Sequence, residues 1–155
     1  MALGKTYDPE SPQAKLGDGF KDYVLEYIQN TGHKAVDLRS ELIRCGYSST
    51  DVNKMEQQQG DIFLPEFHLY LECKTSDTKK DSVCVKPYQR MCFSGPNKFY
   101  VTSYFDGEEF TDLRVHHSEK VKEKMVILKE FCILRTRESS LTLAQLIKNL
   151  EMVAR

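Results

Sequence analysis

The chain has 155 residues, of which 40% are hydrophobic and 29% are charged, and its formal net charge is −1. These values are typical of one compact globular domain spanning residues 1–155, and they exclude a largely disordered chain. The nearly balanced charge also excludes a protein that binds nucleic acid through an overall positive charge, so any such surface must be a local patch.

Cysteine usage and hydropathy bear on the compartment. There are five cysteines, an odd number, and no pair has the CxxC spacing, a pattern typical of a reducing environment. No apolar run is long enough to span a membrane, and the first residues lack the charged-then-apolar pattern of a signal peptide. We therefore expect no membrane partner and a cytoplasmic location, or a nuclear one if the host is eukaryotic.

The first third of the chain predicts an arm, a helix and a short strand. Residues 1–16 contain prolines, glycines and small polar residues, which indicate an irregular arm. An amphipathic helix is expected from Phe20 to Asn30, because apolar side chains recur there at helical spacing. Residues 35–38 favour a short strand that leads into a short helix ending at Cys45, and the polar residues 47–59 are interpreted as a linker.

Two short strands are expected next, at Gly60–Leu64 and His68–Thr75. Side chains alternate between the two faces of a strand, so Glu72 and Lys74 share one face of the second strand. Asp61 lies at the head of the first strand, within reach of that face. The pattern therefore places two carboxylates and one lysine close together.

This trio has a recognisable chemistry. Two carboxylates that converge repel each other unless a cation lies between them, and hard oxygen ligands suit Mg²⁺ or Mn²⁺. A lysine beside such a metal can orient or deprotonate a water molecule and offset charge that develops on a phosphate. Asp61, Glu72 and Lys74 are therefore the residue types that metal-dependent phosphodiester hydrolysis requires. The alternative is a half-exposed antiparallel strand whose solvent-facing side carries a glutamate and a lysine.

Basic residues follow the second strand. The polar loop at residues 75–82 contains Lys79 and Lys80, and Lys86 precedes a helix expected within residues 83–93. Lysines beside a metal suit the phosphate backbone of a nucleic acid, whereas a solvated loop explains them equally well.

The second half of the chain completes the expected sheet and adds helices. The remaining elements are strands at residues 98–104 and 109–115, a helix at 119–134 capped by Ser118, and a last helix opened by a capping box of Thr142 and Gln145. Residues 118–155 are thus expected to form C-terminal helices, and Asp106-Gly107 a hairpin turn between the strands. This order of elements predicts an α/β domain with a mixed central sheet flanked by helices.

At Asp61, Glu72 and Lys74 the sequence resembles the PD-(D/E)xK nuclease superfamily, especially its small branches similar to Holliday-junction resolvases and restriction endonucleases. The resemblance implies a restriction-endonuclease-like fold and a Mg²⁺-dependent endonuclease that hydrolyses DNA, with Mn²⁺ as a substitute metal. It also implies that the Cys73 backbone carbonyl is a further metal ligand beside Asp61 and Glu72. Cleavage of two strands needs two active sites, so a homodimer is expected.

The resemblance extends to the first helix and to the helix after the motif. Related nucleases carry a glutamate on the first helix that helps to order the metal, and Lys21 occupies the matching position here. Asp22 and Glu26 share a helix face and are substitutes for it, and we prefer Glu26 as the fourth catalytic residue. Gln89 best matches a residue that faces the site from the later helix.

Other functions stay open on the sequence alone. The departure at Lys21 is the feature that favours a non-catalytic nucleic-acid-binding or assembly subunit that keeps the nuclease fold. A nuclease directed at RNA differs from the first reading only in its substrate.

Overall fold

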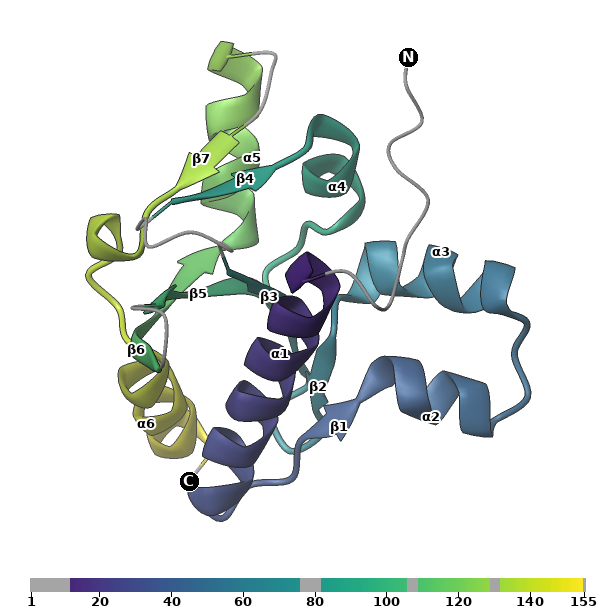
Figure 1. Ribbon diagram of the computed structural model, residues 1–155. Helices are drawn as coiled ribbons and strands as arrows, with labels where there is room; N and C mark the ends of the chain where they lie inside the picture. The colour runs from purple at the N-terminus through teal and green to yellow at the C-terminus, as the bar shows by residue number, and fades with distance from the viewer. Residues whose placement is uncertain (1–11, 76–81, 106–108, 129–131, 155) are drawn as a thin grey trace.

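The computed structural model describes residues 12–75, 82–105, 109–128 and 132–154 and shows a mixed sheet flanked by helices (Figure 1). The five-stranded sheet has the order β1-β2-β3-β5-β6. Strands β3 and β5 are parallel, and the other neighbours are antiparallel. A smaller antiparallel sheet pairs β4 with β7. The expected α/β class with a mixed sheet is confirmed.

The elements have the following bounds. The strands are β1 Val36–Asp37, β2 Ile62–Leu64, β3 Leu69–Lys74, β4 Val83–Val85, β5 Lys98–Phe105, β6 Phe110–His117 and β7 Cys132–Leu134. The helices are α1 Pro12–Asn30, α2 Leu38–Arg44, α3 Ser49–Gln59, α4 Pro87–Cys92, α5 Ser118–Leu128, the short 3-10 helix η1 Thr136–Glu138 and α6 Leu143–Val153.

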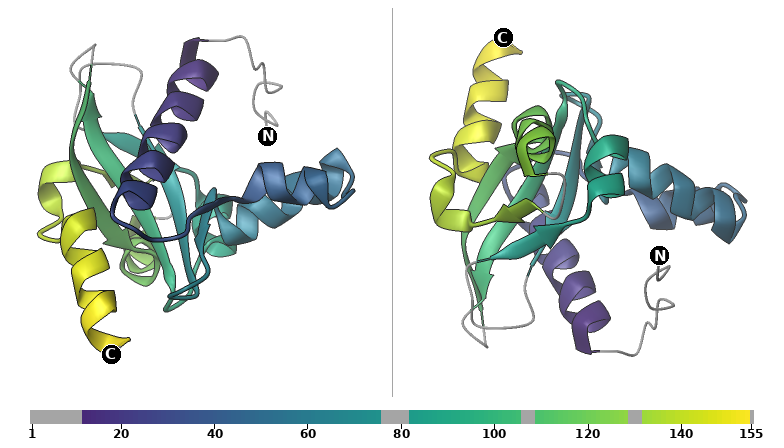
Figure 2. Two further views of the ribbon diagram at one scale, coloured as in Figure 1. Left: turned by 90° about the horizontal axis from the view of Figure 1, so that it is seen from below. Right: turned by 90° about the horizontal axis from the view of Figure 1, so that it is seen from above.

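The sheet is covered on both faces, and each face has its own apolar core. Helices α1 and α6 pack on one face, where Phe20, Val24 and Ile28 of α1 are fully buried against strand residues such as Leu71. The other face carries the β4–β7 pair and α5, as the two views of Figure 2 show, and Tyr100 is buried there. Burying both faces explains why the central strands are apolar on both sides.

Alternation along β3 decides which face carries the charged motif. Leu69 and Leu71 belong to the core beneath α1 and α6, whereas Tyr70 packs against the core on the opposite face. Glu72 and Lys74 follow Tyr70 with the period of two that a strand imposes. The predicted shared face of Glu72 and Lys74 is therefore confirmed.

Helices α2 and α3 form a hairpin that projects from the edge of the sheet beside β1 (Figure 1). The buried apolar residues of these two helices are Leu38, Leu42 and Val52. Arg39 joins them as well, because its Nη1 donates to Asn53 Oδ1 at 3.1 Å and to Glu56 Oε1 at 3.0 Å. This hairpin builds one wall of the cleft described below.

The C-terminal helix α6 begins with the capping box that the sequence predicts. The backbone N–H of Gln145 donates to Thr142 Oγ1 at 3.1 Å, and the N–H of Thr142 donates to Gln145 Oε1 at 3.0 Å. Near the other end of α6, Glu151 Oε1 lies 2.6 Å from His33 Nε2, and Glu66 Oε2 lies 3.0 Å from His33 Nδ1. Hydrogen bonds to Glu151 and Glu66 raise the pKa of His33, whose ring links α6 to the turn between β2 and β3.

Several predicted boundaries are wrong. Helix α1 begins at Pro12, so part of the expected arm is helical. Proline is well suited to a first helical turn. The helix continues through Gly17 and Gly19, which are exposed. Residues 47–59 are not a linker, because α3 occupies most of them, with Ser48 Oγ accepting from the N–H of Asp51.

The expected helix at residues 119–134 is also too long. It ends at Leu128, and Cys132–Leu134 instead pairs with Val83–Val85 as a strand. Ser118 does not cap its own helix, since its hydroxyl donates to the carbonyl of Gly95 and accepts from the N–H of Gly95. Long-range pairing has overridden the local helical pattern here. The Asp106-Gly107 turn lies outside the described residues.

None of the helices in the described part of the chain has the length and apolar character needed to cross a bilayer.

Candidate functional site

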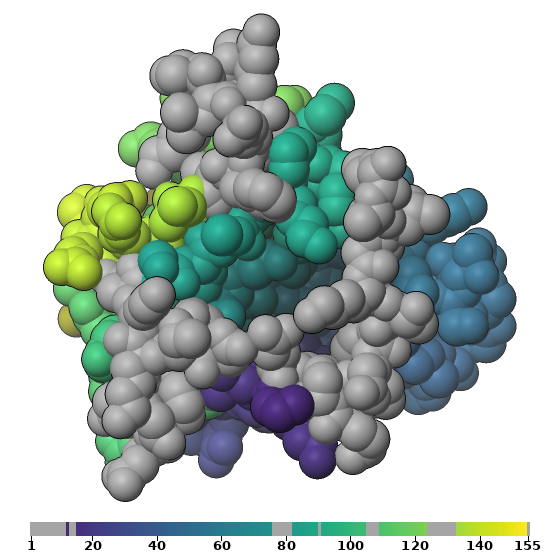
Figure 3. Space-filling view, turned by 45° about the horizontal axis from the view of Figure 1, so that its top comes forward, coloured from purple at the N-terminus to yellow at the C-terminus, as the bar shows by residue number. Residues whose placement is uncertain are grey.

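A cleft of about 470 Å³ lies where α1, the α2–α3 hairpin and α4 meet the sheet. Its lining includes Asp61, Glu72, Cys73 and Gln89, so the motif of β2 and β3 faces this space. Figure 3 looks onto this side of the molecule and shows a hollow over the teal residues, with α3 in blue on one side. The cleft is the natural place for a substrate to meet the charged groups.

Hydrogen bonds hold both the backbone and the side chain of Asp61. Its N–H donates to the carbonyl of Leu71 at 2.8 Å, and its own carbonyl accepts from the N–H of Leu38 at 3.0 Å. Its side chain is held too, because the N–H of Cys73 donates to Asp61 Oδ2 at 2.8 Å. Since Ile62 pairs with Leu71, the register places Asp61 beside Glu72 on the same face of the sheet.

Gly60 makes this close approach possible. Its φ is +81°, a conformation that glycine adopts without steric cost, and a Cβ at this position would lie 2.7 Å from the carbonyl oxygen of Leu71. The turn from α3 into β2 therefore requires glycine, and that turn aims Asp61 into the cleft.

Glu72 is held by a partner on each side. It is only 8% exposed, and Gln89 Nε2 on α4 donates to its Oε1 at 3.1 Å. Lys74 Nζ lies 3.9 Å from the same oxygen. Lys74 does not itself line the cleft as described above, yet it lies directly against a residue that does. The structure thus brings Asp61, Glu72, Lys74 and Gln89 together.

The two carboxyl groups have raised pKa values. Burial raises the pKa of Asp61 to about 6, although the hydrogen bond from the Cys73 N–H and the charge of Lys74 act in the opposite direction. Burial, and then the nearby charge of Asp61, raise the pKa of Glu72 well above its usual value. Adjacent acids whose pKa values are raised by desolvation and by a neighbouring charge are typical of a functional site.

The wall formed by α1 carries a cation. Lys21 Nζ lies 3.2 Å from Asp37 Oδ2, and both residues are partly buried. Burial alone would lower the pKa of Lys21, but the charge and hydrogen bond of Asp37, together with Asp61, raise it overall. Asp37 also caps α2 by accepting from the N–H of Ser40 at 3.3 Å. Lys21 therefore ties α1 to the start of α2 at the cleft.

The structure does not bring Glu26 or Asp22 to the cleft. Both side chains are exposed, and the residues of α1 that line the cleft are Gly17, Asp18 and Lys21. Five residues along a helix turn Glu26 by about 140° from Lys21, which points it away from the cleft. The structure therefore does not support the preference for Glu26 as a fourth catalytic residue, because the rotation of α1 turns Glu26 away from the cleft.

A divalent metal fits the donor set. Among residues 12–75, 82–105, 109–128 and 132–154, no three His, Cys, Asp or Glu side chains are grouped so that they could hold a metal on their own. Mg²⁺, however, usually keeps several waters and needs only one or two carboxylates. Asp61 and Glu72 supply two carboxylates in one cleft, and a divalent cation would relieve the repulsion between them.

The residues predicted to bind nucleic acid have mixed outcomes. Gln89 faces the cleft, whereas Lys86 is exposed just before α4 and does not line the cleft. Lys79 and Lys80 lie outside the described residues. Sequence reasoning missed Arg39 and Glu56, whose ion pair at 3.0 Å lies in the cleft wall. The signal in the sequence that could have revealed α3, and with it this wall, was Ser48 as a helix N-cap residue.

Comparison with known proteins gives no assignment: no protein-family model matches the chain, and no curated protein is significantly similar to it.

Gly60→Ala should lower the free energy of unfolding by ~1–3 kcal/mol, because it forces a strained φ and a close contact with the Leu71 carbonyl oxygen. Gly19→Ala is the matched control: Gly19 lies in α1 with open space around it, and alanine should stabilise the helix by ~0.5–1 kcal/mol. Urea unfolding measures both. Equal stability of Gly60→Ala and the wild type would refute this explanation of how Asp61 is positioned.

Glu72→Gln should stabilise the fold at high pH. The pKa of Glu72 is raised in the folded state above the ordinary value of 4.5, so ionisation opposes folding as the pH rises through and above that value. The amide removes this cost, and we expect a gain on the order of 1–3 kcal/mol at about pH 8 that disappears below about pH 4. Urea unfolding across this pH range measures the difference.

Glu123→Gln, at an exposed position of α5, is the control and should change the free energy of unfolding by less than ~0.5 kcal/mol at either pH. A Glu72→Gln variant that is less stable than the wild type at high pH would show that Glu72 is not held against an electrostatic cost.

Proposed function

We propose that this protein is a Mg²⁺-dependent endonuclease of the PD-(D/E)xK kind, with a restriction-endonuclease-like fold, that hydrolyses phosphodiester bonds in DNA. The observation that carries the proposal is that Asp61 and Glu72 line one cleft while Lys74 lies 3.9 Å from the Glu72 carboxylate. A solvated surface pair, the alternative for Glu72 and Lys74, does not explain an 8% exposed glutamate beside a second, partly buried acid. Support for the fold comes from the mixed sheet that helices cover on both faces.

Each residue has a role in this proposal. Asp61, Glu72 and the Cys73 carbonyl would hold Mg²⁺, or Mn²⁺ in its place. When bound, such an ion polarises a phosphate and lowers the pKa of water. Lys74, as an ammonium, orients the attacking water by a hydrogen bond and offsets charge that develops on the phosphate. Gln89 fixes the Glu72 carboxylate through the 3.1 Å hydrogen bond to Oε1.

A second candidate function is a non-catalytic nucleic-acid-binding or assembly subunit. It is favoured by Lys21, which brings a cation to the α1 wall where related nucleases carry a glutamate. The intact set of Asp61, Glu72 and Lys74 favours turnover instead, and an activity assay distinguishes the two.

The purified protein should cut supercoiled plasmid, a four-way junction or single-stranded DNA in Mg²⁺ or Mn²⁺, and not in EDTA. Lys74→Ala and Asp61→Asn should each lower the rate by ~10²–10⁴-fold, because general acid–base catalysis and metal binding contribute on that scale. Gel electrophoresis of the products over time measures the rates, and RNA is included as a further substrate.

Lys148→Ala, at an exposed position of α6, is the control and should cut at the wild-type rate. If no substrate is cut, the non-catalytic function is preferred. If Lys74→Ala cuts as fast as the wild type, the activity does not come from this site.

Cleavage of both strands would use two copies of the site, so we propose a homodimer as the working form. Sedimentation equilibrium should then give twice the chain mass of 18.0 kDa at assay concentrations, and a monomer that still cuts both strands would argue against it.

A further inference from the structure

We propose that Arg135 and Arg137, on either side of Thr136, bind the phosphate backbone of the substrate next to the catalytic centre. This proposal rests on the nuclease function above and adds a substrate-binding surface to it. Both arginines are exposed, while Thr136 between them is only 3% exposed. Thr136 is the buried anchor of this segment, and the side chains of Arg135 and Arg137 extend from it into solvent.

The anchor lies one strand away from Lys74. Thr136 Oγ1 donates to Thr102 Oγ1 at 3.0 Å in the buried interior. Thr102 is in turn the direct partner of Lys74 in the parallel β3–β5 pair. Neighbouring strands lie ~4.8 Å apart, so η1 sits at the same end of the sheet as the catalytic lysine.

The segment that carries the arginines is held firmly. Arg114 Nη1 on β6 donates to the carbonyl of Ser139 at 3.1 Å, and Ser139 Oγ donates to the carbonyl of Val115. The bonds of Thr136 and Ser139 therefore fix both ends of η1 against β5 and β6. Groups that are already in position lose less conformational entropy when they bind a ligand.

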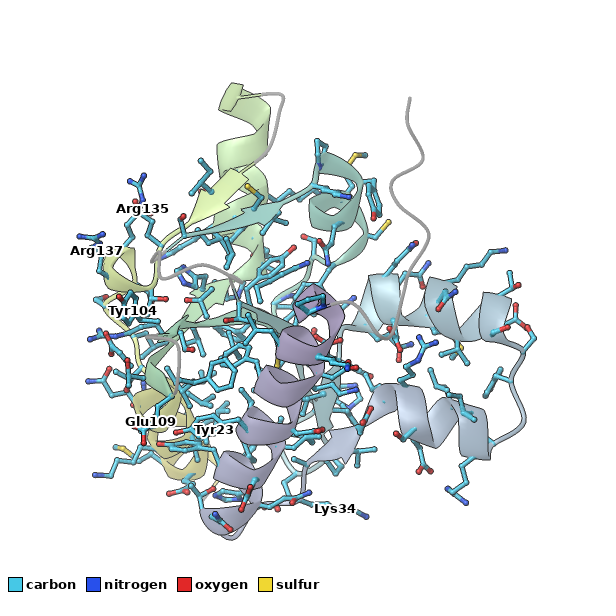
Figure 4. The ribbon with its side chains drawn as sticks, viewed as in Figure 1. Tyr23, Lys34, Tyr104, Glu109, Arg135 and Arg137 are labelled. Carbon is cyan, nitrogen blue, oxygen red and sulfur yellow. The ribbon has the colours of Figure 1, made fainter. Side chains whose placement is uncertain are left out.

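The position of η1 suits a strand of nucleic acid that crosses the cleft. In Figure 3 the yellow-green segment that contains η1 lies across the hollow from α3. Figure 4 shows Arg135 and Arg137 extending away from the body of the protein on that side. A backbone held by the arginines could continue over Glu72 and Lys74 toward Arg39 in the opposite wall.

The chemistry of these side chains matches phosphate. The guanidinium group forms paired, charge-assisted hydrogen bonds with phosphate oxygens. Arg135 Nη1 now lies 3.7 Å from Glu138 Oε1, and both side chains are about half exposed. Such an exposed ion pair contributes little stability, so a phosphate can replace the carboxylate. The acidic centre repels DNA by itself, and cations at its rim offset that repulsion.

The test is a comparison of double variants in a binding assay. Arg135→Gln/Arg137→Gln and the control Lys34→Gln/Lys148→Gln remove the same charge from exposed positions, and Lys34 lies toward the opposite end of the molecule from the arginines (Figure 4). Fluorescence anisotropy with a labelled DNA duplex, without divalent metal and over a salt series, gives the affinity and its salt dependence.

The arginine variant should bind ~10-fold more weakly and reduce the slope of log K against log salt by about 1.8, because each lost phosphate contact accounts for about 0.9. The lysine control should stay within ~2-fold of the wild type. Glu138→Gln should act in the opposite direction and tighten binding by ~2–3-fold, since it removes a competing carboxylate.

The outcomes separate this proposal from the proposed function. If the arginine and lysine double variants bind equally, or Glu138→Gln weakens binding, the arginines do not contact the backbone. Metal-dependent cutting by the wild type would still support the nuclease in that case. If the wild type neither binds nor cuts any nucleic acid, both proposals fail together.

Discussion

The candidate site depends on two carboxyl groups that are brought together where β2 and β3 adjoin. Asp61 and Glu72 lie on the same face, and the charge of Asp61 makes ionisation of the buried Glu72 less favourable. A fold gains no stability from such an arrangement, because desolvated carboxylates are costly unless they are paired. The N–H of Cys73, the amide of Gln89 and the ammonium of Lys74 offset part of that cost. The part of the desolvation cost that these groups do not offset would be removed by a bound cation, as expected of a metal site.

The elements around this pair are joined by polar contacts, so the cleft has fixed walls. Lys21 and Asp37 join α1 to the start of α2, while Arg39 and Glu56 join α2 to α3. Gln89 joins α4 to Glu72 itself. Each contact links a wall of the cleft to its neighbour or to the acidic pair, which limits how far the acids can move apart. Preorganisation of this kind is what catalytic charges require, since a displacement of a charged group weakens its interaction with the reacting atoms.

Local sequence patterns were sufficient for the centre of the fold and for most of the candidate site. Alternation around Glu72, the glycine before Asp61 and the capping box at Thr142 each reflect a constraint on a few neighbouring residues, and the structure agrees with all of them. What failed depends on distant partners. The strand at Cys132–Leu134 exists because Val83–Val85 pairs with it, and its own residues continue a helical pattern.

The choice of Glu26 failed for a related reason, because the rotation of α1 is set by the burial of Phe20, Val24 and Ile28 against the sheet.

The distribution of charge over the surface also depends on how distant residues are brought together by the fold. A net charge of −1 gives no attraction for a polyanion at long range, so any such attraction would come from an uneven distribution of charge over the surface. Asp61 and Glu72 line the cleft, while Arg39 lies in one wall, Arg135 directly precedes η1 and Arg137 lies on it. A polyanion that approached this face would meet arginines at the edges before it met carboxylates, and a divalent cation at the centre would complete the match.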